Sequence, residues 1–125
     1  MKGKLYLSNC YNMNHVPDGT YLINIARKDM EDIWDKRIEL APSKELFTWY
    51  INNKNKVDWF DDYKKIYLNQ LKVNKKALNT LSEIREMLDS GKNVCLMCFC
   101  KDVTKCHRSL VGNLFVKKGY EVIYK

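Results

Sequence analysis

Four short apolar runs along the chain are typical of buried β-strands. They cover residues 4–8, 20–26, 93–99 and 120–124, and each is rich in aliphatic residues or tyrosine. Short continuous runs of this kind, bounded by polar or glycine-containing turns, indicate strands that are covered on both faces, as in a parallel sheet. The pattern therefore predicts a mostly parallel sheet of about four strands.

Between these runs, apolar residues recur at the three- and four-residue spacing of helices. Ser43 and Asp58 stand where helix N-caps are expected, and Gly91 and Gly119 stand where glycines end helices. One helix is predicted after Ser43, one after Asp58, one over about 74–90 and one between the loop 100–105 and Gly119. A further short helix or turn is predicted at 28–37. The last strand–helix–strand unit has the length of a right-handed crossover. We therefore expect residues 1–125 to form a single small Rossmann-like α/β sandwich.

The composition agrees with one globular domain. The chain has 125 residues, of which 46% are hydrophobic and 30% charged, enough for one core and too few for two. Its longest apolar run is much shorter than a membrane span, and its first residues lack the apolar stretch of a signal peptide. We therefore expect a cytoplasmic protein without a membrane partner.

The net charge of +7 is concentrated in the second half of the chain. Residues 72–125 carry 11 basic and five acidic side chains, whereas residues 1–71 carry 11 basic and ten acidic ones. Such a positive field attracts nucleic acid, nucleotides or other small anions. The alternative is a lysine-rich solvated surface without a specific partner, because the lysines are spread rather than gathered in one run.

Four of the five cysteines lie within a dozen residues, around the end of the run at 93–99. This clustering favours a site over a disulfide framework and fits a reducing compartment. Ligands of open α/β sheets bind at the carboxyl ends of the strands, where helices begin. If the sheet is parallel, Ser8, Asn9 and Arg27 lie on the same edge as Cys98. We therefore expect a pocket at this edge.

The residues that open the last predicted helix suit an anion. His107 and Arg108 lie beside its first backbone N–H groups, and a cysteine there ionises readily and can act as a nucleophile. Cys106 and His107 are adjacent on a helix and point about 100° apart, so we do not expect them to form a catalytic pair by themselves. Cys98 is expected to lie close to Cys106 or His107. The predicted catalytic residues are Cys98, Cys106 and His107, and the predicted ligand-binding residues are Arg108, Arg27, Ser8, Asn9 and Cys100.

A zinc site is a weaker interpretation of the same cysteines. Structural zinc sites usually space paired cysteines by two to four residues, whereas one residue separates Cys98 from Cys100. We therefore predict no metal ligands here. A redox pair of Cys98 or Cys100 with Cys106 stays open, although no Cys-x-x-Cys motif lies at those positions. Cys95 is expected to be inert core.

Several segments together resemble the signature of the domain of unknown function family 488. They are Leu96–Cys100, Cys106–Leu110 and Gly119–Val122, with Trp34–Leu46, Trp59–Tyr63 and Tyr67–Leu71 in the middle of the chain. The family typically has a strand ending in Cys-x-Glu and a Cys-His-Arg sequence that opens the last helix. Here Cys100 takes the place of the glutamate, and Asn24 and Arg27 are in looser register than the family's Asp and Arg.

The resemblance implies a Rossmann-like sandwich with a polar pocket formed by Cys98, Cys106, His107, Arg108 and Arg27, and it implies no particular reaction. Our leading hypothesis is a strand-end pocket that binds or acts on a nucleotide-like or nucleic-acid-derived anion. One alternative is a non-catalytic nucleic-acid-binding or regulatory module. The other is a cysteine-dependent enzyme or thiol redox sensor. No cofactor or oligomeric state follows from the residues.

Overall fold

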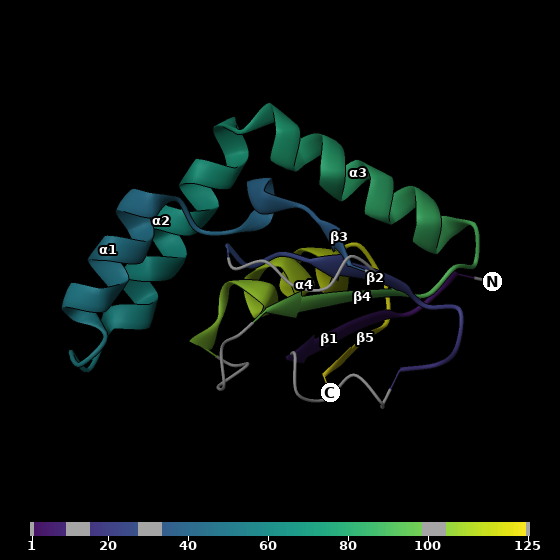
Figure 1. The fold of residues 1–125 in the computed structure, drawn as a ribbon, viewed down its shortest axis with the longest axis horizontal. Helices are drawn as coiled ribbons and strands as arrows, with labels where there is room; N and C mark the ends of the chain where they lie inside the picture. The colour runs from purple at the N-terminus through teal and green to yellow at the C-terminus, as the bar shows by residue number, and fades with distance from the viewer. Residues whose placement is uncertain (1, 10–15, 28–33, 99–104, 125) are drawn as a thin grey trace.

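Five parallel strands form one sheet in the computed structural model, which describes residues 2–9, 16–27, 34–98 and 105–124 (Figure 1). The order across the sheet is β3-β2-β4-β1-β5. The strands are β1 (Leu5–Asn9), β2 (Tyr21–Asn24), β3 (Asp35–Lys36), β4 (Val94–Cys98) and β5 (Val122–Tyr124). The predicted α/β fold is therefore confirmed, with five strands instead of about four.

The additional strand is β3, at one edge of the sheet. It has only two residues, Asp35 and Lys36, which pair with Ile23 and Asn24 of β2. Both residues of β3 are charged, so no apolar run marks this strand in the sequence. The short helix or turn expected at 28–37 is wrong for Asp35 and Lys36, and residues 28–33 lie outside the described part of the chain.

The helices begin and end close to the predicted positions. They are α1 (Lys44–Asn53), α2 (Trp59–Val73), α3 (Lys75–Asp89) and α4 (His107–Lys117), with a short 3-10 helix, η2 (Ile38–Leu40). Ser43 caps α1 as predicted, because its hydroxyl oxygen accepts a hydrogen bond from the Leu46 backbone N–H. Asp58 occupies the N-cap position of α2 without a side-chain capping bond. Gly91 and Gly119 have the positive φ values of glycines that follow helices, 94° and 89°.

No helix among the described residues has the length and apolar character needed to cross a bilayer.

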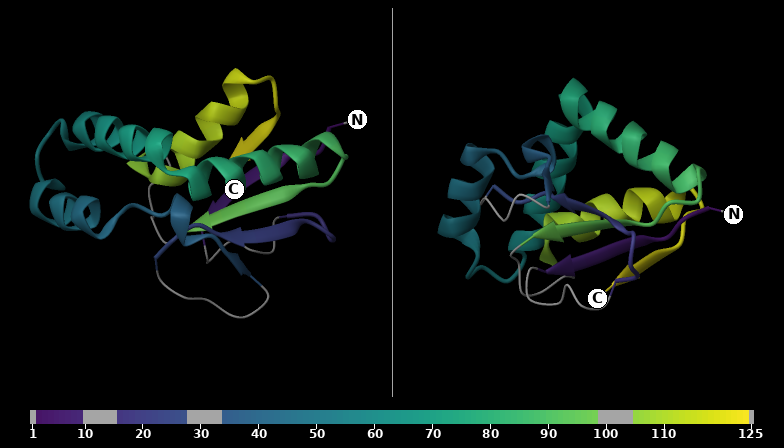
Figure 2. Two further views of the ribbon diagram at one scale, coloured as in Figure 1. Left: turned by 90° about the horizontal axis from the view of Figure 1, so that it is seen from above. Right: turned by 45° about the vertical axis from the view of Figure 1, so that its right-hand side comes forward.

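One apolar core lies between the sheet and the helices. On this face α3 packs against β4, and α4 packs against β1, β4 and β5 (Figure 2). A Cβ atom on Gly112 would lie 2.6 Å from Cδ1 of Leu7, so glycine permits the close approach of α4 to β1. The alternate strand residues Tyr6, Cys95 and Met97 point to the other face and are also buried. Burial on both faces explains why the strands are continuous apolar runs.

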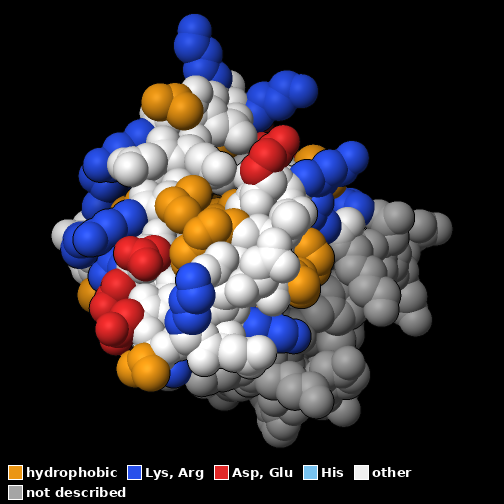
Figure 3. All heavy atoms as spheres, turned by 90° about the vertical axis from the view of Figure 1, so that its left-hand side faces the viewer, with side chains coloured by type: hydrophobic (Ala, Val, Ile, Leu, Met, Phe, Trp, Pro, Cys, Tyr) orange, Lys and Arg blue, Asp and Glu red, His pale blue; other side chains and the backbone are white. Residues whose placement is uncertain are grey.

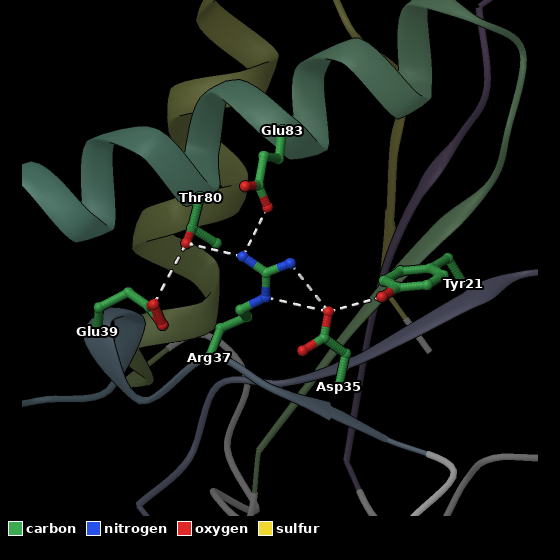
Figure 4. A network of polar contacts seen from close by, with 6 residues as sticks. All are labelled: Tyr21, Asp35, Arg37, Glu39, Thr80 and Glu83. Atoms are coloured by element: carbon green, nitrogen blue, oxygen red, sulfur yellow. Dashed lines mark hydrogen bonds and ion pairs between the residues drawn. The ribbon is translucent and has the colours of Figure 1, made fainter.

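Arg37 connects the β3 edge of the sheet to α3 (Figure 4). Its Nε donates to Oδ2 of Asp35 at 3.0 Å, and its Nη1 forms an ion pair with Glu83 at 2.6 Å. The Tyr21 hydroxyl donates to the same Asp35 oxygen at 2.6 Å, and this hydrogen bond raises the pKa of Tyr21. Polar contacts therefore hold an edge strand that is too short to be held by its ladder alone.

Candidate functional site

The carboxyl ends of three strands meet the beginning of α4 at one edge of the sheet. Cys98 is the last residue of β4, Ser8 lies near the end of β1, and Ile25 directly follows β2. Cys106 is the N-cap residue of α4, and His107 is its first residue. The strand-end location that the parallel pattern predicted therefore brings Cys98, Cys106 and His107 together.

Cys98 and Cys106 are in direct contact. Their Sγ atoms lie 2.9 Å apart, and each residue is only 1% exposed. The described cysteines, which include Cys95, form no disulfide in this structure. The contact joins the end of a strand to the beginning of a helix, eight positions apart in the sequence.

Cys106 also lies close to His107, with 3.7 Å between its Sγ and the ring Nδ1. The expectation that these neighbours would point apart is wrong. It assumed helical backbone at both positions, but Cys106 has extended backbone angles, with φ at −138° and ψ at 150°. The angle of about 100° between successive side chains applies only inside a helix.

The His107 ring is fixed by its other nitrogen. Nε2 lies 2.8 Å from the carbonyl oxygen of Ile25. A carbonyl only accepts hydrogen bonds, so Nε2 must carry the proton, and in the neutral ring Nδ1 then holds a lone pair. That lone pair faces Cys106. His107 can therefore accept a proton from the cysteine pair or coordinate a cation together with it.

Tyr67 of α2 packs against His107, and sequence reasoning assigned it only to the core. The two ring centroids are 5.8 Å apart, and the Tyr67 hydroxyl donates to the Leu40 carbonyl at 2.6 Å. Burial raises the pKa of Tyr67 far above its ordinary value, and negative charge on Cys106 and Cys98 adds to that rise. The signal in the sequence was only an aromatic residue at helical spacing, which is typical of core positions.

Arg108 is 1% exposed and holds strand ends together. Its Nη1 donates to the Ser8 carbonyl and lies 3.5 Å from the Cys98 carbonyl. Burial raises the pKa of the Cys95 thiol to about 12, and the positive charge of Arg108 partly opposes this rise. The ligand-binding role predicted for Arg108 stays a prediction, since these two contacts are with the backbone.

The other predicted ligand-binding residues are distributed differently. Ser8 is buried and supplies a carbonyl to the site, whereas the side chain of Asn9 and all of Cys100 lie outside what the structure describes. Arg27 is half-buried, and its Nη1 donates to the Pro42 carbonyl at 2.9 Å. Among the described residues, Ser8 and Arg108 therefore lie at the strand ends with the three predicted catalytic residues, whereas Arg27 bonds to the segment before α1.

A cleft of about 810 Å³ lies between η2, the start of α1, the end of α2 and the start of α3. Tyr67 lines this cleft and also packs against His107, whereas Cys98, Cys106 and His107 are not among the lining residues. The charged residues of its wall are Arg27, Glu39, Glu45, Lys75 and Lys76. The cleft is large enough for a small-molecule ligand, and its wall carries one more positive than negative side chain.

Lysine and arginine are also prominent on the surface around α1 and α2. Figure 3 shows this side of the molecule, with basic side chains around a group of hydrophobic ones and with fewer acidic side chains. Phe47 and Ile51 of α1 are each 47% exposed. Such a surface suits a negatively charged partner without identifying one.

Three donor groups of the site are close enough to share a metal ion. The sulfur atoms of Cys98 and Cys106 and a ring nitrogen of His107 all lie within 4.8 Å of one another, and all three residues are buried. The sequence spacing argued against zinc because it paired Cys98 with Cys100. The fold instead groups one residue from a strand end with two residues from a helix start.

Comparison with known families and proteins gives one match. A family model described as "DUF488-N3a: Active DUF488-N3 subclade" matches residues 12–119. No curated protein and no solved structure matches the chain.

Proposed function

Because the chain belongs to the DUF488 family, in a subclade described as active, we propose that it is a cysteine-dependent enzyme acting on an anionic substrate. The observation that carries this proposal is the grouping of Cys98, Cys106 and His107. The two sulfur atoms are 2.9 Å apart, and the imidazole Nδ1 is 3.7 Å from Cys106. A nucleophile, a base and a group that orients the base are the parts that covalent catalysis needs.

Cys106 is the residue best placed to act as the nucleophile. Nδ1 of His107 accepts the thiol proton, while the Ile25 carbonyl holds the ring through Nε2. The positive end of the α4 dipole favours the thiolate, and the thiol of Cys98 can donate a hydrogen bond to it. The thiolate then bonds to an electrophilic atom of the substrate as the bond to the leaving group breaks. His107 returns the proton to that leaving group.

The preference for an anion rests on charge. Arg27, Lys75 and Lys76 line the cleft next to Tyr67, and residues 72–125 carry most of the net positive charge. A nucleotide-like or nucleic-acid-derived anion is the substrate class we propose, because such ligands combine a planar base with phosphate. The clustering of four cysteines within a dozen residues supports our placement of the protein in the cytoplasm.

Two alkylating reagents test the proposal without a known substrate. Iodoacetate and iodoacetamide transfer similar groups and both release iodide, but only iodoacetate is an anion. We expect Cys106 to be the described cysteine that reacts fastest. We also expect its rate ratio, iodoacetate over iodoacetamide, to exceed the ratio for glutathione by about fivefold, the effect of one favourable charge interaction of roughly 1 kcal/mol.

The variant Arg27→Gln should lower this ratio, whereas Arg85→Gln, on the exposed surface of α3, should leave it unchanged. The variant His107→Gln should slow both reagents, because it removes the base that accepts the Cys106 proton. If Cys106 reacts no faster than Cys95, the cysteine is not a nucleophile. If its ratio equals that of glutathione, the site does not favour anions.

A non-catalytic nucleic-acid-binding module is the second candidate, and the basic surface beside α1 and α2 favours it (Figure 3). Contacts with phosphates make such binding weaken steeply as salt rises. Binding of single-stranded RNA or DNA at low salt, with unchanged affinity in Cys106→Ser, would support this candidate. No binding at low salt would exclude it.

A further inference from the structure

We propose that Cys98, Cys106 and His107 together bind a soft divalent metal ion, with Zn²⁺ as the ion that suits them best. Two thiolates and one imidazole form a donor set that binds zinc in preference to calcium or magnesium. The three donor atoms lie within 4.8 Å of one another. Residues from a strand end and a helix start thus form a ligand set that the sequence spacing does not reveal.

The orientation of His107 supports coordination. Histidines that bind metals usually donate their second ring N–H to a carboxylate or a backbone carbonyl, which fixes the tautomer and the ring. Nε2 of His107 lies 2.8 Å from the Ile25 carbonyl, so Nδ1 is the nitrogen left to coordinate. That nitrogen is the one 3.7 Å from the Cys106 sulfur.

The surroundings of the group favour negative sulfur ligands. Cys106 is at the N-terminus of α4, and the guanidinium of Arg108 is buried among the same strand ends. Two thiolates and a divalent cation are neutral as a unit, so burial does not leave an uncompensated charge. The 1% exposure of both cysteines is therefore compatible with a bound ion.

The geometry requires one small change. Zn–S bonds of about 2.3 Å in a tetrahedral site place two sulfurs about 3.8 Å apart. The Cys98–Cys106 distance of 2.9 Å must therefore lengthen by about 0.9 Å, which a modest rotation about one χ1 angle supplies. Among the described residues these three supply ligands, and a tetrahedral zinc ion takes four.

Metal binding and thiol chemistry compete for the same sulfur atoms. A thiolate that coordinates Zn²⁺ is a weaker nucleophile, so the ion should protect Cys106 from alkylation. This competition rests on the proposed function, whereas the metal site itself does not.

Titration of the reduced, untagged protein with Co²⁺ tests the metal site. Tetrahedral cobalt with thiolate ligands gives sulfur-to-cobalt charge-transfer absorption in the near ultraviolet and strong bands in the visible. We expect both, saturating at one equivalent, and we expect Zn²⁺ to displace them. The variants Cys98→Ser and His107→Gln should weaken Co²⁺ binding by about 100-fold. Loss of an outer-shell partner already weakens metal binding by about 10- to 100-fold, and each of these variants loses a direct ligand. Cys95→Ala should bind as the wild type does.

Absence of these bands at one equivalent of Co²⁺ would overturn the metal site, and so would bands unaffected by both Cys98→Ser and His107→Gln. Circular dichroism checks that each variant is folded, and two variants keep the test valid if one unfolds. Cobalt bands together with ordinary thiol reactivity in the metal-free protein would refute only the proposal of a cysteine-dependent enzyme. Fast anion-selective alkylation without cobalt bands would refute only the metal site.

Discussion

Replacing Arg108 with alanine should unfold the protein at markedly lower denaturant. The side chain is 1% exposed and donates to the Ser8 carbonyl of β1, with the Cys98 carbonyl of β4 at 3.5 Å. A hydrogen bond from a charged donor contributes about 1.5–3 kcal/mol, and the truncation also leaves a cavity. Relief of the buried charge offsets part of this loss. We expect a net decrease of about 3–5 kcal/mol in the free energy of unfolding.

Urea unfolding followed by circular dichroism measures this change. A typical domain has only about 5–15 kcal/mol of stability, so the shift in midpoint should be large. Arg85→Ala is the matched control, because Arg85 is exposed on α3 and its loss should change stability by less than about 0.5 kcal/mol. Arg108→Lys keeps the charge but not the planar fork of donors, so its stability should fall between those of the wild type and Arg108→Ala.

A loss below about 1 kcal/mol for Arg108→Ala would refute this reasoning, since that is the range of a surface contact. The guanidinium would then not be needed at the strand ends. It would instead be available for the ligand-binding role that the sequence predicted.

Three other contacts give separate expectations. Tyr67→Phe removes the hydrogen bond to the Leu40 carbonyl and should lower the unfolding free energy by about 1–2 kcal/mol in urea titrations. Cys95 has a folded pKa of about 12 against an ordinary 9.0, so mass spectrometry should find it unmodified after alkylation of the native protein at about pH 8. Its contribution to stability is complete below pH 9 and is lost as pH rises toward 12, and Cys95→Ala should flatten that part of the stability curve. Arg37→Gln removes ion pairs with Glu83 and Asp35, and because the Arg37 side chain is partly exposed, calorimetry should show a loss of only about 1–2 kcal/mol that shrinks in high salt.

The general fold could be predicted because each element has a local signal. The long strands are continuous apolar runs, and α1 and α3 follow polar residues whose side chains cap them. β3 gave no such signal, because two charged residues are held by pairing with β2 and by Arg37. Tertiary contacts formed that strand, and no pattern within its own residues specifies it.

The position of the candidate site could be predicted, but its geometry could not. Parallel strands put Cys98 and the start of α4 at one edge, as expected. The contact between Cys106 and His107 depends on extended backbone at the N-cap, which residue spacing does not report. The carbonyls of Ile25 and Ser8 are backbone groups present at every position, so their roles become visible only when the chain is folded.

Mild oxidation tests the central claim most directly, namely that Cys98 and Cys106 form one chemical unit. Diamide removes two hydrogen atoms from a pair of neighbouring thiols and joins their sulfurs. Peptide mapping of the briefly oxidised protein should find one main disulfide, between Cys98 and Cys106, because their sulfurs are 2.9 Å apart. A main disulfide that joins either residue to another cysteine, or no disulfide while both thiols remain reduced, would contradict the account.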